Sequence, residues 1–282
     1  MTFSIVGHGT DARGEAAWGV AVASKFLAVG NAVPAAVAGV GALATQAEAN
    51  VAWKGIGLSL LDEGATASVA LQRMIEEDDR RDHRQLGMVD GEGGAATYTG
   101  TACLEWAGGV AETTAGDGVA IQGNILVGPE VVEEMKRAWD AAADEPLARR
   151  LLAALVAGDG AGGDHRGRQS AALLVVSDGA GYAGLDDVAV DLRVDDHEDP
   201  VTELARLLDL NDFYLTASTE EEKVPVTPEL SAELEGLAQA AGHRDLLAWV
   251  GTENYEMRVA DDGSWIDRKV LDLLRGQRGE DR

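Results

Sequence analysis

The chain has 282 residues, and its 49 acidic side chains against 23 Lys and Arg give a formal net charge of −26. This length allows one large domain with a smaller second one, and the charge argues against a nucleic-acid partner because phosphates would be repelled. The acidic excess and the scarcity of lysine predict a halophilic protein, since salt screens the repulsion between carboxylates.

Membrane segments and thiol sites are not expected. No apolar run reaches the roughly 18 residues of a membrane helix, and no signal-peptide pattern precedes Thr2. We therefore expect a cytoplasmic protein that does not enter a membrane. Cys103 is the only cysteine, so it cannot form an internal disulfide or a thiolate metal cluster, and we expect a small buried side chain there.

The first half of the chain predicts two groups of strands with helices between them. A hairpin is expected first, followed by short strands, one or two helices, a second hairpin, and a strand that ends at a Gly-Asn bend. In chain order these elements are 2–7 paired with 17–25, 28–46, 56–78, 84–90 paired with 95–100, and 118–128.

The second half predicts paired helices, a glycine-rich loop, two strands and a further helix. Their ranges are 129–143, 146–157, 158–167, 169–177, 187–195 and 200–210. This order favours two packed sheets between layers of helices over a regular βαβ alternation. Residues 216–230 have the composition of a linker. We place the boundary near residue 220, between a domain of residues 1–220 and a small, mostly helical unit of residues 221–282 with a short strand pair.

Common cofactor and metal motifs are weak in this sequence. The "GVGALA" segment at 39–44 follows two hairpin strands rather than opening a βαβ unit, and the loop 158–167 lacks the Lys of a P-loop. The five histidines are scattered, so we predict no cofactor and no metal. The acidic segment 195–199 leaves a metal-dependent hydrolase as a third, weaker alternative, which a chelator would test.

Polar residues at the ends of apolar strands are the strongest indication of a site, because sites are built over the ends of buried strands. They occur after the second and third strands, at the Gly-Asn bend and around the glycine-rich loop. These residues are Ser24, Lys25, Thr45, Gln46, Gln122, Asn124, Asp164, Arg166, Gln169 and Ser170.

Several segments together resemble the DUF1028 family, which is grouped with the N-terminal nucleophile (Ntn) hydrolases. They are "TFSIVG", "WGVAVASKFLAVGNAVP", "GVGALATQA", "RQLGMVD", "IQGNIL" and "GGDHRGRQSAALLVV". The likeness runs from Thr2 to about residue 215 and implies an α+β fold, a four-layer αββα sandwich of two antiparallel sheets, with an N-terminal Thr and no cofactor. Residues 249–274 resemble a C-terminal region that some members carry, described as peptidoglycan-binding.

The chemistry expected from this resemblance centres on Thr2, exposed by removal of Met1. An α-amino group has an ordinary pKa of about 7.7 to 8.0, so it can accept the hydroxyl proton near neutral pH. We expect Lys25 to lower the pKa of the amine and hydroxyl by its charge, and Asn124 to donate to the oxyanion. The residues expected to bind substrate or orient the amine are Ser24, Gln46, Asp164, Arg166, Gln169 and Ser170.

Two functions of different classes follow. The first is an amidohydrolase that cleaves a small linear amide or peptide-like bond through an acyl-enzyme on Thr2. The second is a non-catalytic relative whose cleft binds a small molecule, with Thr2 only a strand residue. Mass spectrometry of the chain separates them, because a retained Met1 blocks the amine. A homodimer is one assembly compatible with the sequence.

Overall fold

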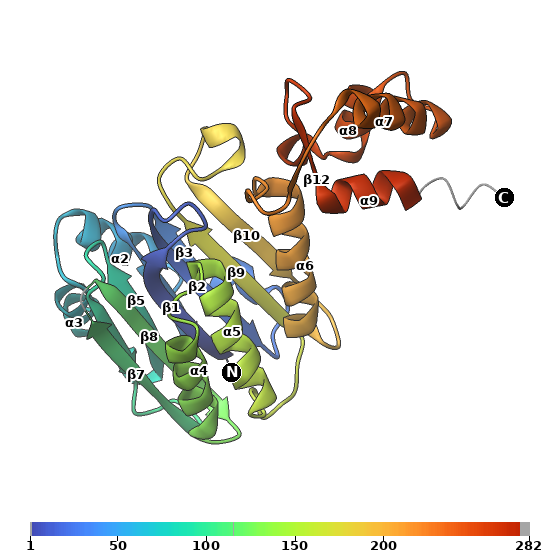
Figure 1. Cartoon of the computed structure of the whole chain (residues 1–282). Coiled ribbons are helices and arrows are strands. Elements are labelled where there is room, and N and C mark those ends of the chain that lie inside the picture. Colours follow the sequence, from blue (N-terminus) through green and yellow to red (C-terminus); the bar gives the residue numbers. More distant parts are fainter. Residues whose placement is uncertain (1, 115, 277–282) are drawn as a thin grey trace. The chain divides into compact units, whose positions relative to one another are not determined.

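The computed structural model describes residues 2–114 and 116–276. The chain forms two compact units, Met1–Leu208 and Asp209–Arg282. Among the described residues every strand pairing is antiparallel. Nine α-helices accompany the strands in this described part (Figure 1). The protein is therefore of the mixed α+β class, with antiparallel sheets.

The larger sheet of the first unit has six strands, and its centre is the predicted first hairpin. β1 and β2 pair so that Phe3 lies opposite Ala23, and the other edge of β1 pairs with β8. Small and β-branched residues allow close packing on both faces of these central strands. In spatial order the strands are β10 (Val188–Val194), β9 (Ser170–Val176), β2 (Ala16–Ser24), β1 (Thr2–Thr10), β8 (Asp117–Leu126) and β7 (Trp106–Thr114).

The smaller sheet of the first unit has four strands joined in chain order. The predicted second hairpin forms its β5 and β6, connected by a turn in which the Asp90 N–H donates to the Gly94 carbonyl at 2.9 Å. The strands are β3 (Pro34–Val37), β4 (Gly41–Ala47), β5 (Arg84–Asp90) and β6 (Ala95–Thr99).

Helices cover the outer face of each sheet. Phe3 and Ile5 of the six-stranded sheet share a core with apolar side chains of α4, α5 and the first part of α6, and Figure 1 shows α4 and α5 lying across the strands. Leu43 and Leu86 of the four-stranded sheet pack with α2 and α3. The helices of this unit are α1 (Val29–Ala32), α2 (Trp53–Asp62), α3 (Ala67–Glu76), α4 (Glu130–Ala141), α5 (Leu147–Gly160) and α6 (Pro200–Leu215), which continues into the second unit.

The inner faces of the two sheets share a third core whose composition changes along the strands. At one end, Val6 and Val20 of the larger sheet pack with Ala42 and Val89 of the smaller one. Because side chains alternate between faces along a strand, Thr2 and Ser4 share the inner face with Val6. The inner layer is thus apolar at one end and polar at the end where β1 begins.

The second unit has its own core. Trp249 and Leu234 are fully buried among the apolar side chains of its helices, and the buried Arg258 donates to Asp267 at 3.0 Å. Its elements after α6 are β11 (Lys223–Pro225), α7 (Pro228–Ala240), α8 (Leu246–Glu253), β12 (Trp265–Asp267) and α9 (Arg268–Gly276). The predicted small helical unit with one strand pair is therefore present.

Several predicted elements were wrong in type or extent. Residues 29–32 form a helical turn rather than a strand, and β7 was not predicted, because its glycines and exposed polar residues hide the alternation. Asn124 lies inside β8 and not at a bend; the backbone irregularity falls at Ile125, which has a φ of 51°. Helix α6 extends to Leu215, and β11 forms within the predicted linker.

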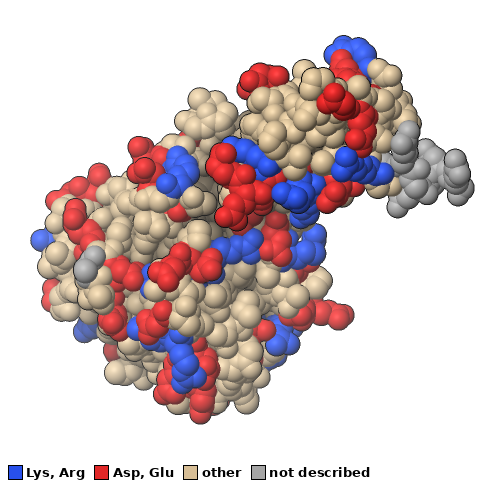
Figure 2. Space-filling view, in the orientation of Figure 1, with Lys and Arg blue, Asp and Glu red and all other residues tan. Residues whose placement is uncertain are grey.

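The surface carries the expected acidic excess. Figure 2 shows Asp and Glu spread over the visible face, with the fewer Lys and Arg placed among them. Neighbouring opposite charges pair in several places, as in Lys136 with Asp140 at 2.7 Å. No helix in the described ranges is both long and apolar enough to cross a membrane.

Candidate functional site

The polar end of the inner layer is a group of hydroxyl and amide side chains, called here the interlayer cluster. Each side chain is placed by strand alternation, and strands of both sheets contribute. The members are Thr2, Ser4, Ser24, Gln46, Gln85, Thr97, Thr99, Gln122 and Asn124.

Thr2 lies at the centre of three contacts in this cluster. Its Oγ1 is 3.1 Å from Ser24 Oγ, and either hydroxyl can be the donor. Its carbonyl accepts from Gln46 Nε2 at 3.3 Å. In the β1–β8 ladder Thr2 is directly opposite Asn124, so the two side chains share the inner face. Met1, whose removal the predicted chemistry requires, lies outside the described residues.

Gln46, Ser4 and Gln122 connect the two sheets through a directed series of bonds. Ser4 Oγ donates to Gln46 Oε1 at 2.7 Å and accepts from Gln122 Nε2 at 2.7 Å. Space for the Gln122 amide comes from Gly87, where an added Cβ would lie 1.9 Å from Gln122 Oε1. All three side chains are at most 1 % exposed, so their hydrogen bonds replace water in a layer that water does not reach.

The glycine-rich loop brings Asp164 to the end of β2. Asp164 Oδ2 accepts from the backbone N–H of Lys25 at 2.8 Å, and Oδ1 accepts from the backbone N–H of Arg166 at 2.8 Å. The Lys25 ammonium donates to the Arg168 carbonyl at 3.2 Å. Lys25 thus adjoins Ser24 in sequence, but its charged end is bonded to the loop.

The remaining predicted site residues have other partners. Ser170 Oγ donates to the Phe26 carbonyl and accepts from the Val29 N–H, so it fixes the segment that follows β2. Gln169 Nε2 donates to Asp196 at 3.0 Å, which directs it to the segment after β10. The guanidinium of Arg166 contacts Asp164 Oδ2 at 3.3 Å.

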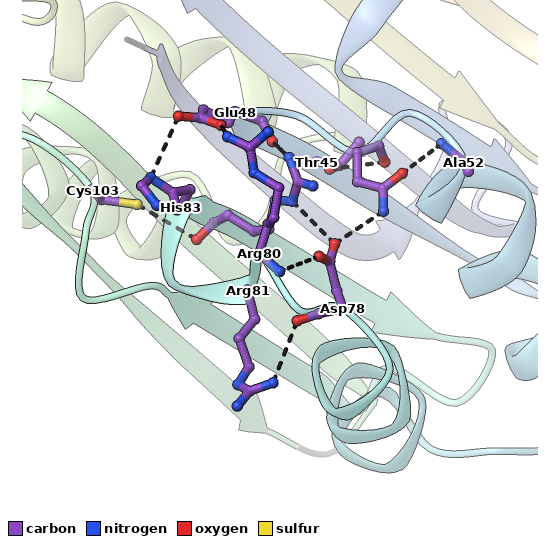
Figure 3. A network of polar contacts seen from close by, with 10 residues as sticks. Thr45, Glu48, Ala52, Asp78, Arg80, Arg81, His83 and Cys103 are labelled. Carbon is purple, nitrogen blue, oxygen red and sulfur yellow. Dashed lines mark hydrogen bonds and ion pairs between the residues drawn. The ribbon is translucent and has the colours of Figure 1, made fainter.

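A network of charged residues anchors the loops beside Gln46 and Gln85 (Figure 3). Glu48 follows β4, and its carboxylate pairs with Arg80 and with His83. Asp78 accepts from Arg84 Nε at 3.0 Å and from Asn50 at 3.1 Å. These bonds tie the end of β4 to the start of β5, the two strands that carry the amides of the cluster.

Two pKa shifts occur in this network. Burial opposes ionisation of Asp78, but hydrogen bonds from Arg80 N–H, Asn50 and Arg84 outweigh it and hold the pKa of Asp78 below its ordinary value. Burial raises the pKa of Cys103, whose Sγ donates to the Arg84 carbonyl at 3.5 Å. Cys103 is half-buried rather than buried as predicted, and as a neutral thiol it is a poor nucleophile.

A small hollow adjoins the cluster at Ser24. Its cavity volume is about 10 Å³, and it is lined by Ser24, Asp164, Arg168 and Ser170 among others. This is about the space of one water molecule, whereas ligand pockets usually offer roughly 300 Å³ or more, so the hollow as it stands fits only a water-sized group. Among the described residues no three His, Cys, Asp or Glu side chains are grouped as metal ligands.

Sequence reasoning missed Gln85, Ser4 and the threonines of β6. Polar site residues were expected at the ends of strands, whereas Gln85 stands at the start of β5. In an antiparallel pair the start of one strand lies beside the end of its neighbour, and Gln85 is directly opposite Gln46. Pairing the two predicted strands would have indicated it.

The fold and the cluster define an α+β protein with two antiparallel sheets and a polar site between them. The chain belongs to the family described as "Family of unknown function (DUF1028)", whose sequence model matches residues 2–204. Residues 231–274 match a "Putative peptidoglycan binding domain". A crystal structure of a DUF1028 protein from Silicibacter pomeroyi is similar, with a TM-score of 0.64 and 32 % identity over 75 % of this chain and 86 % of that one. None of the curated proteins matches.

Proposed function

We propose that the chain is an amidohydrolase of the N-terminal nucleophile type, with the first unit as an αββα sandwich of that class. The observation that carries the proposal is the position of Thr2. It begins the central strand of the larger sheet, its hydroxyl is 3.1 Å from Ser24 Oγ, and the Asn124 amide stands opposite it. Once Met1 is removed, the hydroxyl and α-amine of Thr2 and the amide donor of Asn124 would lie at one cross-strand residue pair.

The reaction proceeds in two halves. The Thr2 amine takes the hydroxyl proton while Oγ1 bonds to the amide carbonyl carbon, and the carbonyl electron pair moves onto oxygen. The oxyanion then collapses, the C–N bond breaks, and the leaving amine takes the proton from the Thr2 ammonium. Water cleaves the resulting ester with the same amine as base, and a carboxylic acid leaves.

The neighbouring residues have separate tasks in this proposal. Asn124 donates to the oxyanion, an interaction worth about 3 to 4 kcal/mol in a water-excluded site. Ser24 orients the Thr2 hydroxyl. Lys25 lowers the pKa of the amine and hydroxyl through its charge, although its ammonium is bonded to the Arg168 carbonyl in this structure. Asp164 borders the hollow beside Ser24 and Arg166 contacts Asp164, and in this proposal the two receive the substrate, a small linear amide or peptide-like molecule.

The decisive experiment combines intact mass, amide-library turnover and variants of Thr2. We expect the purified chain to lack Met1, and Thr2→Ala to lower turnover by at least about 1,000-fold with a melting temperature close to wild type. Thr2→Ser keeps a hydroxyl beside the amine and should retain part of the rate. Turnover by a form that keeps Met1, or by Thr2→Ala at the wild-type rate, would contradict the mechanism.

A second candidate is a non-catalytic protein that binds a small molecule. It is favoured by the low exposure of Thr2, 6 %, and by the hollow beside Ser24, whose volume of about 10 Å³ leaves little space for an amide next to the Thr2 hydroxyl. Retention of Met1 would support this candidate, and periodate, which cleaves an N-terminal threonine with a free amine, would then remove no fragment from the N-terminus. Ligand binding would then survive Thr2→Ala.

The setting of the reaction is proposed from composition. The charge of −26 favours a salty cytoplasm, where amides of small metabolites are available and no phosphate polymer is bound. The second unit matches a peptidoglycan-binding family, but we assign the substrate site to the first unit because the cluster is complete within it.

A further inference from the structure

Both polar atoms of the Gln85 side chain, Nε2 and Oε1, make several hydrogen bonds in the interlayer cluster. It is 0 % exposed. Its Nε2 donates to Thr99 Oγ1 at 2.9 Å and to the carbonyls of Gly123 and Gly108 at 2.8 and 3.3 Å. Its Oε1 accepts from Gln46 Nε2 and from Asn124 Nδ2, both at 2.8 Å.

The backbone around Gln85 determines which way its amide faces. Carbonyl oxygens only accept, so the carbonyls of Gly123 and Gly108 require the NH₂ group on their side. A flipped amide would place Oε1 against two carbonyl oxygens in a buried layer, with only the Thr99 hydroxyl able to donate to it. Gln85 Oε1 must therefore face Gln46 and Asn124.

The orientation of the Gln85 amide determines the orientation of the Asn124 and Gln46 amides. Asn124 must present its NH₂ to Gln85, and because an amide nitrogen has two protons, the second can serve another acceptor. Gln46 must do the same, and its Nε2 also donates to the Thr2 carbonyl at 3.3 Å. One buried amide thus sets the donor direction of Asn124 and holds the backbone of Thr2.

We infer that Gln85 is the positioning residue of this site: it fixes Asn124 as a hydrogen-bond donor toward an oxygen bound beside Thr2, and through Gln46 it holds the Thr2 backbone. The inference rests on the proposed function for what that oxygen is, namely the carbonyl oxygen of the amide as it becomes an oxyanion. Gln85 does not touch the substrate. Its effect on the rate passes mainly through the Asn124 amide, with a smaller part through Gln46 and the Thr2 backbone.

Nuclear magnetic resonance tests the positioning without any substrate. The chain has five asparagines, so selective ¹⁵N labelling gives five side-chain amide pairs, and Asn124→Ala identifies the Asn124 pair. In wild type we expect these protons to exchange more slowly than those of the exposed Asn254. In Gln85→Met they should exchange at least about 10-fold faster, the equivalent of one lost hydrogen bond.

Gln122→Met is the matched control for that measurement. It removes a buried amide of the same size from the same layer, but Gln122 bonds to Ser4 and Thr97 through its side chain, so Asn124 should stay protected. Equal exchange in the two variants would overturn the inference. If Gln85→Met does not fold, the wild-type rates decide, because an Asn124 pair that exchanges as fast as that of Asn254 is not held.

Kinetics with any amide that the wild type cleaves test the consequence. We expect Gln85→Met to lower kcat by about 10- to 100-fold, less than complete loss of an oxyanion donor, with little change in KM. In an Asn124→Ala background the same change should have a much smaller effect, because the oxyanion donor it positions is gone and only the Gln46 contact with the Thr2 backbone is left to lose. If the losses in kcat from Gln85→Met and Asn124→Ala multiply in the double variant, the inference is contradicted. Protection of Asn124 with full activity of Thr2→Ala would instead reject the proposed function and leave the positioning intact.

Discussion

Gly87 shows how one residue without a side chain makes the polar layer between the sheets possible. An alanine Cβ there would lie within 2.6 Å of all three atoms of the Gln122 amide group. The Gln122 side chain is flexible, but it is fully buried and hydrogen-bonded to Ser4 and Thr97. Moving it would therefore break the bonds that join the sheets.

We expect Gly87→Ala to reduce the free energy of unfolding by about 1 to 3 kcal/mol, the usual cost of overpacking together with buried polar groups that lose partners. Gly55→Ala is the control, because that exposed position in α2 has no atom within 4 Å of an added Cβ. It should be neutral or stabilising by up to about 1 kcal/mol. Urea denaturation measures both, and equal effects of the two changes would show that Gln122 moves freely.

Some residues of the candidate site were predictable from the sequence and others were not, and the reason is geometric. Ser24, Gln46 and Asn124 were found because a polar residue at the end of an apolar run is visible in the sequence. Gln85 was missed because its partners come from four other strands, and their register is not visible in any one segment. The bond between Lys25 and the Arg168 carbonyl depends on the conformation of a glycine-rich loop, which sequence patterns do not determine.

At the scale of elements, hairpins and amphipathic helices were predicted best, because local periodicity determines them. The hairpin of β1 and β2, the hairpin of β5 and β6, and the helices α2 to α5 are present near their expected ranges. β7 was missed because it is an edge strand with Gly108, Gly109 and several exposed polar residues, so it lacks the apolar alternation of a buried strand.

One carboxylate of the network beside the site, Asp78, gives a pH prediction. Its folded pKa is lowered, chiefly by hydrogen bonds that overcome the effect of burial. A group with a lowered folded pKa stabilises the protein above its unfolded pKa, about 3.9 for Asp, and loses that contribution as the pH falls through the folded pKa. Near neutral pH the ionised Asp78 should therefore contribute fully.

We expect Asp78→Asn to lower the free energy of unfolding at pH 7 by about 1 to 3 kcal/mol, as for hydrogen bonds to charged groups. The difference from wild type should shrink progressively below about pH 4. The exposed neighbour serves as control, since Asp79→Asn removes the same charge without these bonds. Denaturation curves at several pH values measure the effect, and a difference that stays constant down to acid pH would show that ionisation of Asp78 does not matter.

At the scale of the whole molecule, the charge of −26 is the dominant property. Carboxylates outnumber the available cations, so many acidic side chains on the surface repel one another (Figure 2). At low ionic strength this repulsion acts over about 30 Å, whereas in 1 M salt it is screened within about 3 Å. The folded state, which holds these charges closer together than the unfolded chain does, should gain most from screening.

We therefore expect the melting temperature to rise strongly between roughly 0.05 and 1 M KCl, as the screening length falls below the spacing of surface charges. The matched variant neutralises four exposed carboxylates that lie outside the site, Asp62, Glu63, Glu77 and Glu221, by replacement with the corresponding amides. It should melt higher than wild type at low salt, and its melting temperature should depend less on KCl, because there is less repulsion to screen.

Sucrose, which favours burial without screening charge, should raise the melting temperatures of wild type and variant equally. A wild-type melting temperature that does not change with KCl, or a variant with the same salt dependence, would show that charge repulsion does not limit the stability of this protein and would remove the basis for a halophilic setting.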